Sequence, residues 1–126
     1  LYSGEGNDTL TGGDGADTFY FATTSDGTNA ITDFLSGTDR FQFLQGGFGG
    51  ISTTIDATNF ETISGNFSNG TLAGPSFIFA DTAGANSGAL FFDADGSGAG
   101  AGYQVATLNV DSMTAADIDV TTISPV

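Results

Sequence analysis

Histidine and cysteine are both missing from the 126-residue sequence, and a single basic residue, Arg40, accompanies 15 aspartates and glutamates. Without these side chains the chain cannot form a Cys/His zinc site, a reactive thiol or a Ser-His-Asp triad. Phosphate binding needs clustered lysines and arginines, so nucleic acid is excluded as a direct partner and an anionic membrane surface is disfavoured. The formal charge of −14 leaves the carboxylates without counter-charges, which points to a hard cation bound through oxygen.

Long apolar runs are absent too. No stretch approaches the roughly 18 residues needed to span a bilayer, and no charged start leads into an apolar segment of the signal-peptide type. We therefore expect no membrane insertion. Proline is scarce, at two residues, whereas glycine reaches 20 and phenylalanine 12. This stock of aromatic residues argues against a disordered acidic tail and predicts one compact domain.

A nine-residue repeat opens the chain. Residues 3–11 (SGEGNDTLT) superimpose on residues 12–20 (GGDGADTFY), so that glycines, an aspartate, a threonine and a large apolar residue recur in register. Glycine permits a positive φ, which lets a loop turn its carbonyls toward an ion. The aspartate supplies a charged oxygen, and the threonine and apolar residue predict a very short strand. Leu1 extends the apolar column by one step, so we expect more repeats upstream in the intact protein.

Both copies match the pattern G-G-x-G-x-D-x-U-x, in which U is large and apolar, with Ser3 in place of the first glycine of the first copy. This resembles the RTX (haemolysin-type) calcium-binding repeat of type I-secreted bacterial proteins. The resemblance implies a parallel β-roll in which two repeats make one turn and Ca²⁺ lies between loops stacked one turn apart. The alternative is that both segments are ordinary turns rich in glycine and aspartate. On the RTX interpretation the metal-site residues are Ser3, Gly4, Glu5, Gly6, Asp8, Gly12, Gly13, Asp14, Gly15 and Asp17.

Beyond residue 20 the repeat decays. Residues 30–41 (AITDFLSGTDRF) resemble the I-x-D-F-x-x-G-x-D-[KR] stretch that follows the last repeat in RTX proteins, where the aspartates help to close the final calcium sites. The resemblance gives that role to Asp33 and Asp39. Asp26, which projects onto Asp8 after eighteen residues, is a further candidate. The alternative is that Asp33 and Asp39 only cap turns before a strand at 41–43. Arg40 would pair with one of these two aspartates or a nearby carbonyl, or lie solvated at an edge.

Short strands at about ten-residue spacing predict an antiparallel sheet or sandwich in the rest of the chain. The expected strands are at 76–80, 89–92, 103–108 and about 118–123, with one capped helical turn at 114–117. Residues 51–63 are ambiguous: Asp56 could cap a helical turn, or 51–55 could be a strand, and we expect a short strand followed by a turn. Residues 88–100 and 108–120 resemble the hairpin and terminal element of the RTX C-terminal cap, as in the C-terminal domain of serralysins.

Asp93 and Asp95 open a stretch (DADGSG) that copies the start of an EF-hand loop. The bidentate glutamate expected at the twelfth position is Gln104, whose neutral amide cannot supply that charge. The stretch is therefore either a weak calcium site or a plain turn between two strands. These carboxylates lie in a glycine-rich turn with nothing to raise the pKa of either, so they do not suit a glycosidase. We expect no enzymatic activity.

The sequence thus predicts an all-β fold, in which a short parallel β-roll of calcium-binding nonapeptide repeats is followed by an antiparallel β-sandwich-like cap. The roll is expected over residues 1–43 and the cap over 44–126, as one continuous unit. The predicted function is a calcium-binding C-terminal module of a larger secreted RTX protein. The resemblance implies that a type I ABC exporter reads the C-terminus, within residues 70–126. The alternative is a structural or adhesive module of a matrix, surface layer or filament, in which copies of the chain self-associate.

Overall fold

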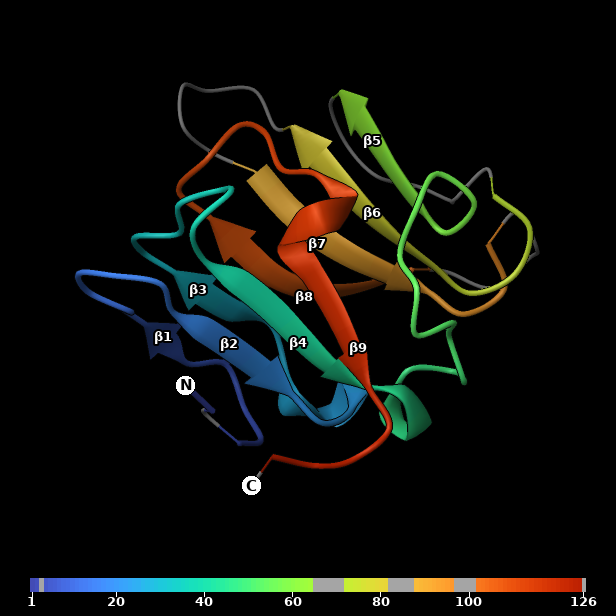
Figure 1. Cartoon of the computed structure of the whole chain (residues 1–126), viewed down its shortest axis with the longest axis horizontal. Helices are drawn as coiled ribbons and strands as arrows, with labels where there is room; N and C mark the ends of the chain where they lie inside the picture. The colour runs from blue at the N-terminus through green and yellow to red at the C-terminus, as the bar shows by residue number, and fades with distance from the viewer. Residues whose placement is uncertain (3, 65–71, 82–87, 97–101, 126) are drawn as a thin grey trace.

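The structure is a computed structural model that describes residues 1–2, 4–64, 72–81, 88–96 and 102–125. Within these ranges nine strands form two sheets (Figure 1). The strands are β1 (Thr9–Leu10), β2 (Thr18–Phe21), β3 (Asn29–Ile31), β4 (Arg40–Leu44), β5 (Phe60–Ser64), β6 (Ser76–Asp81), β7 (Gly88–Asp93), β8 (Tyr103–Leu108) and β9 (Ile118–Thr121). Three single-turn 3₁₀ helices connect them: η1 (Thr24–Asp26), η2 (Gln45–Gly47) and η3 (Ala115–Asp117). In the described part of the chain no helix is long and apolar enough to cross a membrane.

The first 44 residues alternate between the two sheets, which makes the first two turns of a roll. β1 pairs in parallel with β3, with Thr9 opposite Ala30, and β2 pairs in parallel with β4, with Thr18 opposite Arg40. One circuit of the chain therefore takes 21 or 22 residues rather than the eighteen of two nonapeptides. The spacing grows because the loops of the second turn no longer follow the repeat.

β8 and β9 return to the roll from far along the chain. β8 pairs in parallel with β3, and β9 pairs in parallel with β4 (Figure 1). Ala30 lies opposite Thr107 and Phe41 lies opposite Ile118, so both pairs have the same sequence separation of 77 residues. β8 and β9 are thus a third turn of the roll, and residues 45–102 are inserted between the second turn and the third.

The inserted strands extend the larger sheet, whose order is β1-β3-β8-β7-β6-β5. β7 is antiparallel to β6 and β8, whereas β5 is parallel to β6. The all-β class, with a parallel roll and an attached sheet, is therefore confirmed. The strands expected in an antiparallel sheet at 103–108 and about 118–123 are β8 and β9, and they lie in the roll instead. Their apolar residues continue the columns of β3 and β4. The strand expected at 51–55 is wrong: this segment forms bends, and the strand β5 follows it.

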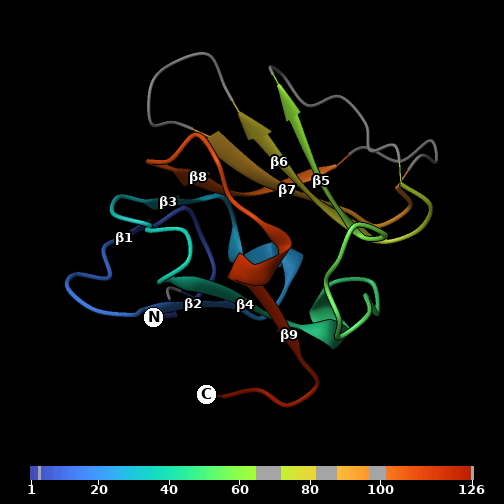
Figure 2. The same ribbon diagram turned by 45° about the horizontal axis from the view of Figure 1, so that its top comes forward.

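Phenylalanine fills the space between the sheets; Figure 2 shows the three-stranded sheet lying below part of the larger one. Phe19, Phe21, Phe41 and Phe43 alternate along β2 and β4 and are at most 1% exposed. The Phe43 ring lies 4.3 Å from that of Phe77, centroid to centroid, which joins the roll to the inserted strands. One apolar cluster therefore runs through both parts, and the division expected at residue 43 stays a prediction.

Candidate metal centre

The two repeat loops have the same backbone form. Gly4 and Gly13 have φ values of +83° and +93°, and Gly6 and Gly15 have values of +116° and +100°. The nine-residue register therefore holds in conformation as well as in sequence. Only glycine adopts such angles at little cost, which explains why the repeat needs glycine at these two places.

The loops stack in two columns, one at each end of the strands. The first column contains residues 4–8 and 22–28, which precede β1 and β3. The second column contains residues 11–17, 32–39 and 109–117, which connect the strands of the first, second and third turns. Each column brings side chains of one turn against the backbone of the turn before it.

In the first column Asn29, rather than Asp26, lies beside Asp8. The Oδ1 atom of the buried Asn29 accepts a hydrogen bond of 2.8 Å from the Asp8 N–H, and Asn7 Oδ1 accepts one of 2.8 Å from Thr28. The eighteen-residue projection of Asp26 onto Asp8 is wrong in register, because the circuit here is 21 residues long. The carboxylate of Asp26 instead accepts the N–H of Ala22, at 2.7 Å, within its own loop.

Gly27 marks the closest approach of the loops in this column. A Cβ atom built on Gly27 would lie 2.1 Å from the carbonyl oxygen of Gly6 and 2.7 Å from Asn7 Oδ1. No side chain fits there without moving the backbone. Position 27 therefore requires glycine for two reasons: there is no space for a Cβ atom, and the backbone φ is +83°.

In the second column Asp33 and Asp39 hold successive turns together. The Asp33 carboxylate accepts the N–H groups of Gly12 and Gly13, at 2.9 and 2.7 Å. The N–H groups of Gly13 and then Gly12 lower the pKa of Asp33, because they stabilise the charged form. Asp39 Oδ1 accepts the N–H of Asp17 at 2.9 Å. Both aspartates thus act as turn caps. They also stay predicted calcium ligands, since a carboxylate has about four lone-pair positions.

Asp8 and Asp17, the aspartates of the two repeats, differ from these caps. The Oδ2 atom of each is buried and has no hydrogen-bond partner within the described residues. An unpartnered buried carboxylate oxygen is costly, and a bound cation removes that cost. The Asp17 carboxylate lies against the backbone of Gly12, since a Cβ built there would be 2.5 Å from Asp17 Oδ2. Carboxylates together with backbone carbonyls are the donors that Ca²⁺ takes. Among the described residues no three acidic side chains lie close enough together to hold a metal ion by themselves, so carbonyls would supply most ligands.

The other predicted site residues differ in burial. The side chains of Glu5 and Asp14 are exposed, and a calcium role for them stays a prediction. Ser3 lies outside the described residues. Asp93 is fully buried at the end of β7 and accepts the N–H of Asp95 at 3.2 Å. The EF-hand-like stretch is described only to residue 96, and a calcium role there stays a prediction.

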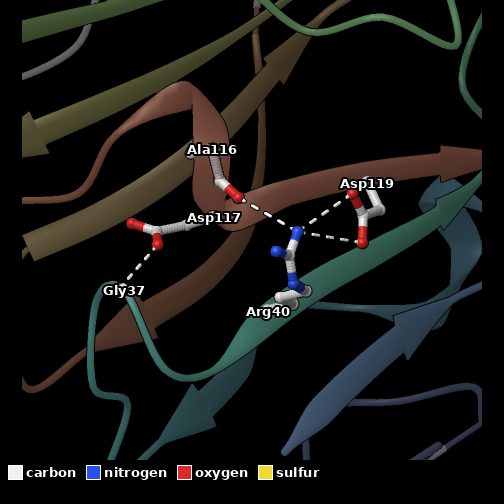
Figure 3. A network of polar contacts seen from close by, with 5 residues as sticks. All are labelled: Gly37, Arg40, Ala116, Asp117 and Asp119. Carbon is white, nitrogen blue, oxygen red and sulfur yellow. Dashed lines mark hydrogen bonds and ion pairs between the residues drawn. The ribbon is translucent and has the colours of Figure 1, made fainter. Parts of the chain in front are cut away.

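The third turn is tied to the second in the same manner (Figure 3). Asp117 accepts hydrogen bonds from the Ser36 hydroxyl, at 2.6 Å, and the Gly37 N–H, at 2.8 Å. Asn109 Oδ1 accepts the N–H of Phe34 at 2.7 Å. Asn29, Asn109 and Asp117 were missed as linking residues because none occupies a repeat position. Aligning the apolar columns (Leu10, Ile31 and Leu108) rather than a fixed period is the signal that finds them.

The packing of Gly27 yields a test with a matched control. Gly27→Ala and Gly37→Ala both place alanine at nearly the same φ, +83° and +86°, but only at Gly27 would the new Cβ meet neighbouring backbone. We expect Gly37→Ala to lower the free energy of unfolding by about 1–2 kcal/mol, and Gly27→Ala to lower it by about 1–3 kcal/mol more. Urea unfolding in excess calcium measures both. Equal losses would contradict the close approach of the two loops.

Residues 1–26 match the family model of the RTX calcium-binding nonapeptide repeat, which describes four copies of the repeat. No curated protein matches the chain. The matched residues contain both loops with paired positive-φ glycines, and both buried unpartnered oxygens, of Asp8 and Asp17. RTX nonapeptide repeats bind calcium ions, and they occur in secreted bacterial proteins. Residues 1–26 of the chain therefore carry RTX-type calcium-binding nonapeptide repeats.

Proposed function

We propose that this chain is the calcium-binding C-terminal module of a larger exported RTX protein, and that it folds on meeting calcium outside the cell. The observation that carries the proposal is the pair of buried, unpartnered Oδ2 atoms of Asp8 and Asp17. They lie at the same position of two loops with the same glycine conformation. A cation is the group that would satisfy both loops alike.

Repulsion between carboxylates explains why folding would require calcium. The second column stacks Asp17, Asp33 and Asp39 within two turns, and the whole chain offers one base against 15 acids. Without a cation these carboxylates repel one another. With calcium bound, the binding free energy becomes folding free energy. Extracellular calcium modules have dissociation constants of roughly 10⁻⁴–10⁻³ M, which suits calcium outside a cell and leaves the sites empty in the cytosol.

The first turn is where this dependence would be strongest. β1 has two residues and neither is buried, whereas β2 and β4 bury phenylalanines between the sheets. A turn with so little core gains little from the hydrophobic effect. Its loops, however, hold the two unpartnered aspartates, so calcium would supply the stabilisation that the core does not.

The chain would pass through the exporter in its unfolded state. The proposed exporter-recognition region, residues 70–126, includes β8 and β9, which pair with β3 and β4 when folded. A segment paired in this way cannot be extended for passage at the same time. Low cytosolic calcium would keep the carboxylates unneutralised and the module open until it has crossed.

The main test is removal of calcium. In excess chelator we expect the isolated chain to lose much of its far-ultraviolet β signal and to melt at a far lower temperature than with calcium. Magnesium at the same concentration is the control for charge alone, and it should not restore the fold because it demands a small, near-octahedral cage and dehydrates reluctantly. Circular dichroism measures both. An unchanged spectrum and melting curve in chelator would overturn the proposal.

Asp17→Asn and Asp14→Asn separate the buried carboxylate from its exposed neighbour in the same loop. Both variants remove one negative charge and keep the shape. We expect Asp17→Asn to raise the calcium concentration at the folding midpoint about tenfold, because it loses a charged ligand, and Asp14→Asn to raise it less than about twofold. A calcium titration followed by circular dichroism gives both midpoints. Equal shifts would mean that Asp17 acts only through its charge at a distance.

Export and calcium binding should separate along the chain. A parent protein that lacks residues 70–126 should stay inside the cell. A parent with Asp8→Asn and Asp17→Asn should be exported but remain protease-sensitive, because its loops lack their charged ligands once calcium is met. Immunoblots of cell and medium fractions, with limited proteolysis of the exported protein, decide this. Full export of the truncated protein would remove the export role and leave the adhesive or matrix interpretation.

A further inference from the structure

Arg40 lies where the second turn of the roll meets the third (Figure 3). It begins β4, and its Nη1 atom lies 3.2 Å from the carbonyl oxygen of Ala116 and 3.2 Å from each carboxylate oxygen of Asp119. Both partners belong to the third turn. The pairing with a carbonyl agrees with the sequence analysis, whereas the acidic partner is Asp119 rather than Asp33 or Asp39. A single cationic nitrogen therefore bridges two successive turns.

The junction around Arg40 is acidic. Asp39 and Asp117, which are 3% and 2% exposed, line a small cavity of about 100 Å³ between loops 32–39 and 109–117, together with Gly37, Arg40, Thr114 and Ala116. Asp119 adds a further carboxylate on β9. No other basic side chain exists in the sequence to balance these charges.

The equivalent junction one turn earlier has no such cation. There, loops 11–17 and 32–39 meet, and the Oδ2 atom of Asp17 is buried without a partner in the described residues. The first junction therefore has an unpartnered carboxylate oxygen, Asp17 Oδ2. At the second junction the Arg40 guanidinium contacts a carboxylate, that of Asp119, and a backbone carbonyl, that of Ala116.

We propose that Arg40 is a built-in cation that does between the second and third turns what calcium does between the first and second. The inference rests on the proposed calcium-dependent folding of the first turn. A guanidinium keeps its charge at every physiological pH, so in the folded module the junction of the second and third turns takes its cation from the chain itself and needs no calcium ion of its own. The calcium sites of this column would therefore lie between the first and second turns.

The test compares Arg40→Gln with Arg40→Lys and Thr53→Glu. Arg40→Gln removes the cation, and Arg40→Lys keeps it; a lysine ammonium suffices, since Nη1 alone makes all three contacts. Thr53→Glu, at an exposed position outside the roll, changes the net charge by the same amount as Arg40→Gln. The ion-pair side chains are 51% and 50% exposed, so the expected effect is modest: a melting temperature lower by about 3–6 °C in Arg40→Gln and by less than about 1 °C in the other two.

A second measurement distinguishes a calcium surrogate from an ordinary ion pair. Calcium is raised about tenfold beyond the concentration that saturates the wild-type transition, at constant ionic strength so that screening does not change. Arg40→Gln should regain most of its lost melting temperature, because a calcium ion can then contact the same oxygens. The wild type and Thr53→Glu should not shift relative to each other. A deficit in Arg40→Gln that added calcium leaves unchanged overturns the inference, as does a deficit in Arg40→Lys equal to that in Arg40→Gln.

Failure of the proposed function is recognised separately. If the wild-type fold ignores calcium, the proposed function fails. The surrogate role then fails with it if Arg40→Gln also ignores calcium. If Arg40→Gln alone becomes calcium-responsive, the surrogate role of Arg40 stands without the proposed function.

Discussion

Side-chain oxygens that accept backbone N–H groups from the preceding turn are the contacts on which the roll depends. Asn29 binds the backbone of Asp8, Asp33 binds Gly12 and Gly13, Asp39 binds Asp17, and Asp117 binds Gly37. A parallel strand pair of two or three residues contributes few ladder hydrogen bonds of its own. The loops therefore do more than connect strands: they supply the hydrogen bonds that set the spacing between turns. Changing a loop length without moving its linking residue would break that spacing.

The same contacts create the electrostatic problem of the fold. A carboxylate is a strong acceptor for two N–H groups at once, as Asp33 is for Gly12 and Gly13. Repeating this device from turn to turn brings acids into one column, and a chain with a single arginine cannot balance them. Neutral Asn29 and Asn109 carry the linking role at two places without adding charge. Asp8 and Asp17, the aspartates of the repeats, each keep one buried oxygen without a partner in the described residues, which a divalent cation would satisfy.

Local features of the roll could be predicted from the sequence, and long-range features could not. The paired glycines predicted the positive φ values, because only glycine takes them readily. The eighteen-residue period does not hold after residue 20, because the loops of the second turn are longer. A fixed offset therefore placed Asp26 beside Asp8, where Asn29 lies in the structure. The third turn could not be predicted at all. Leu108 and Ile118 continue the columns of Ile31 and Phe41. They are separated from these partners by 77 residues of sequence, however, and nothing local distinguishes a strand of the roll from a strand of an antiparallel sheet.

The inserted strands explain why the roll ends where it does. A parallel roll leaves an open edge on each sheet, and each edge can accept another turn. In the larger sheet β7 occupies the free edge of β8 in antiparallel orientation, so that no further turn can pair there. β6 and β5 then extend this sheet over the phenylalanines of β4, where the ring of Phe77 on β6 contacts that of Phe43. In the smaller sheet β9 is the last strand, and it carries Asp119, which pairs with Arg40 of the neighbouring strand β4. A charged, short edge strand is a poor template for further pairing. Growth of the roll beyond its third turn is thus blocked by an antiparallel strand in one sheet and by charge in the other, whereas the calcium-binding repeats lie at the opposite end of the roll, at β1 and β2.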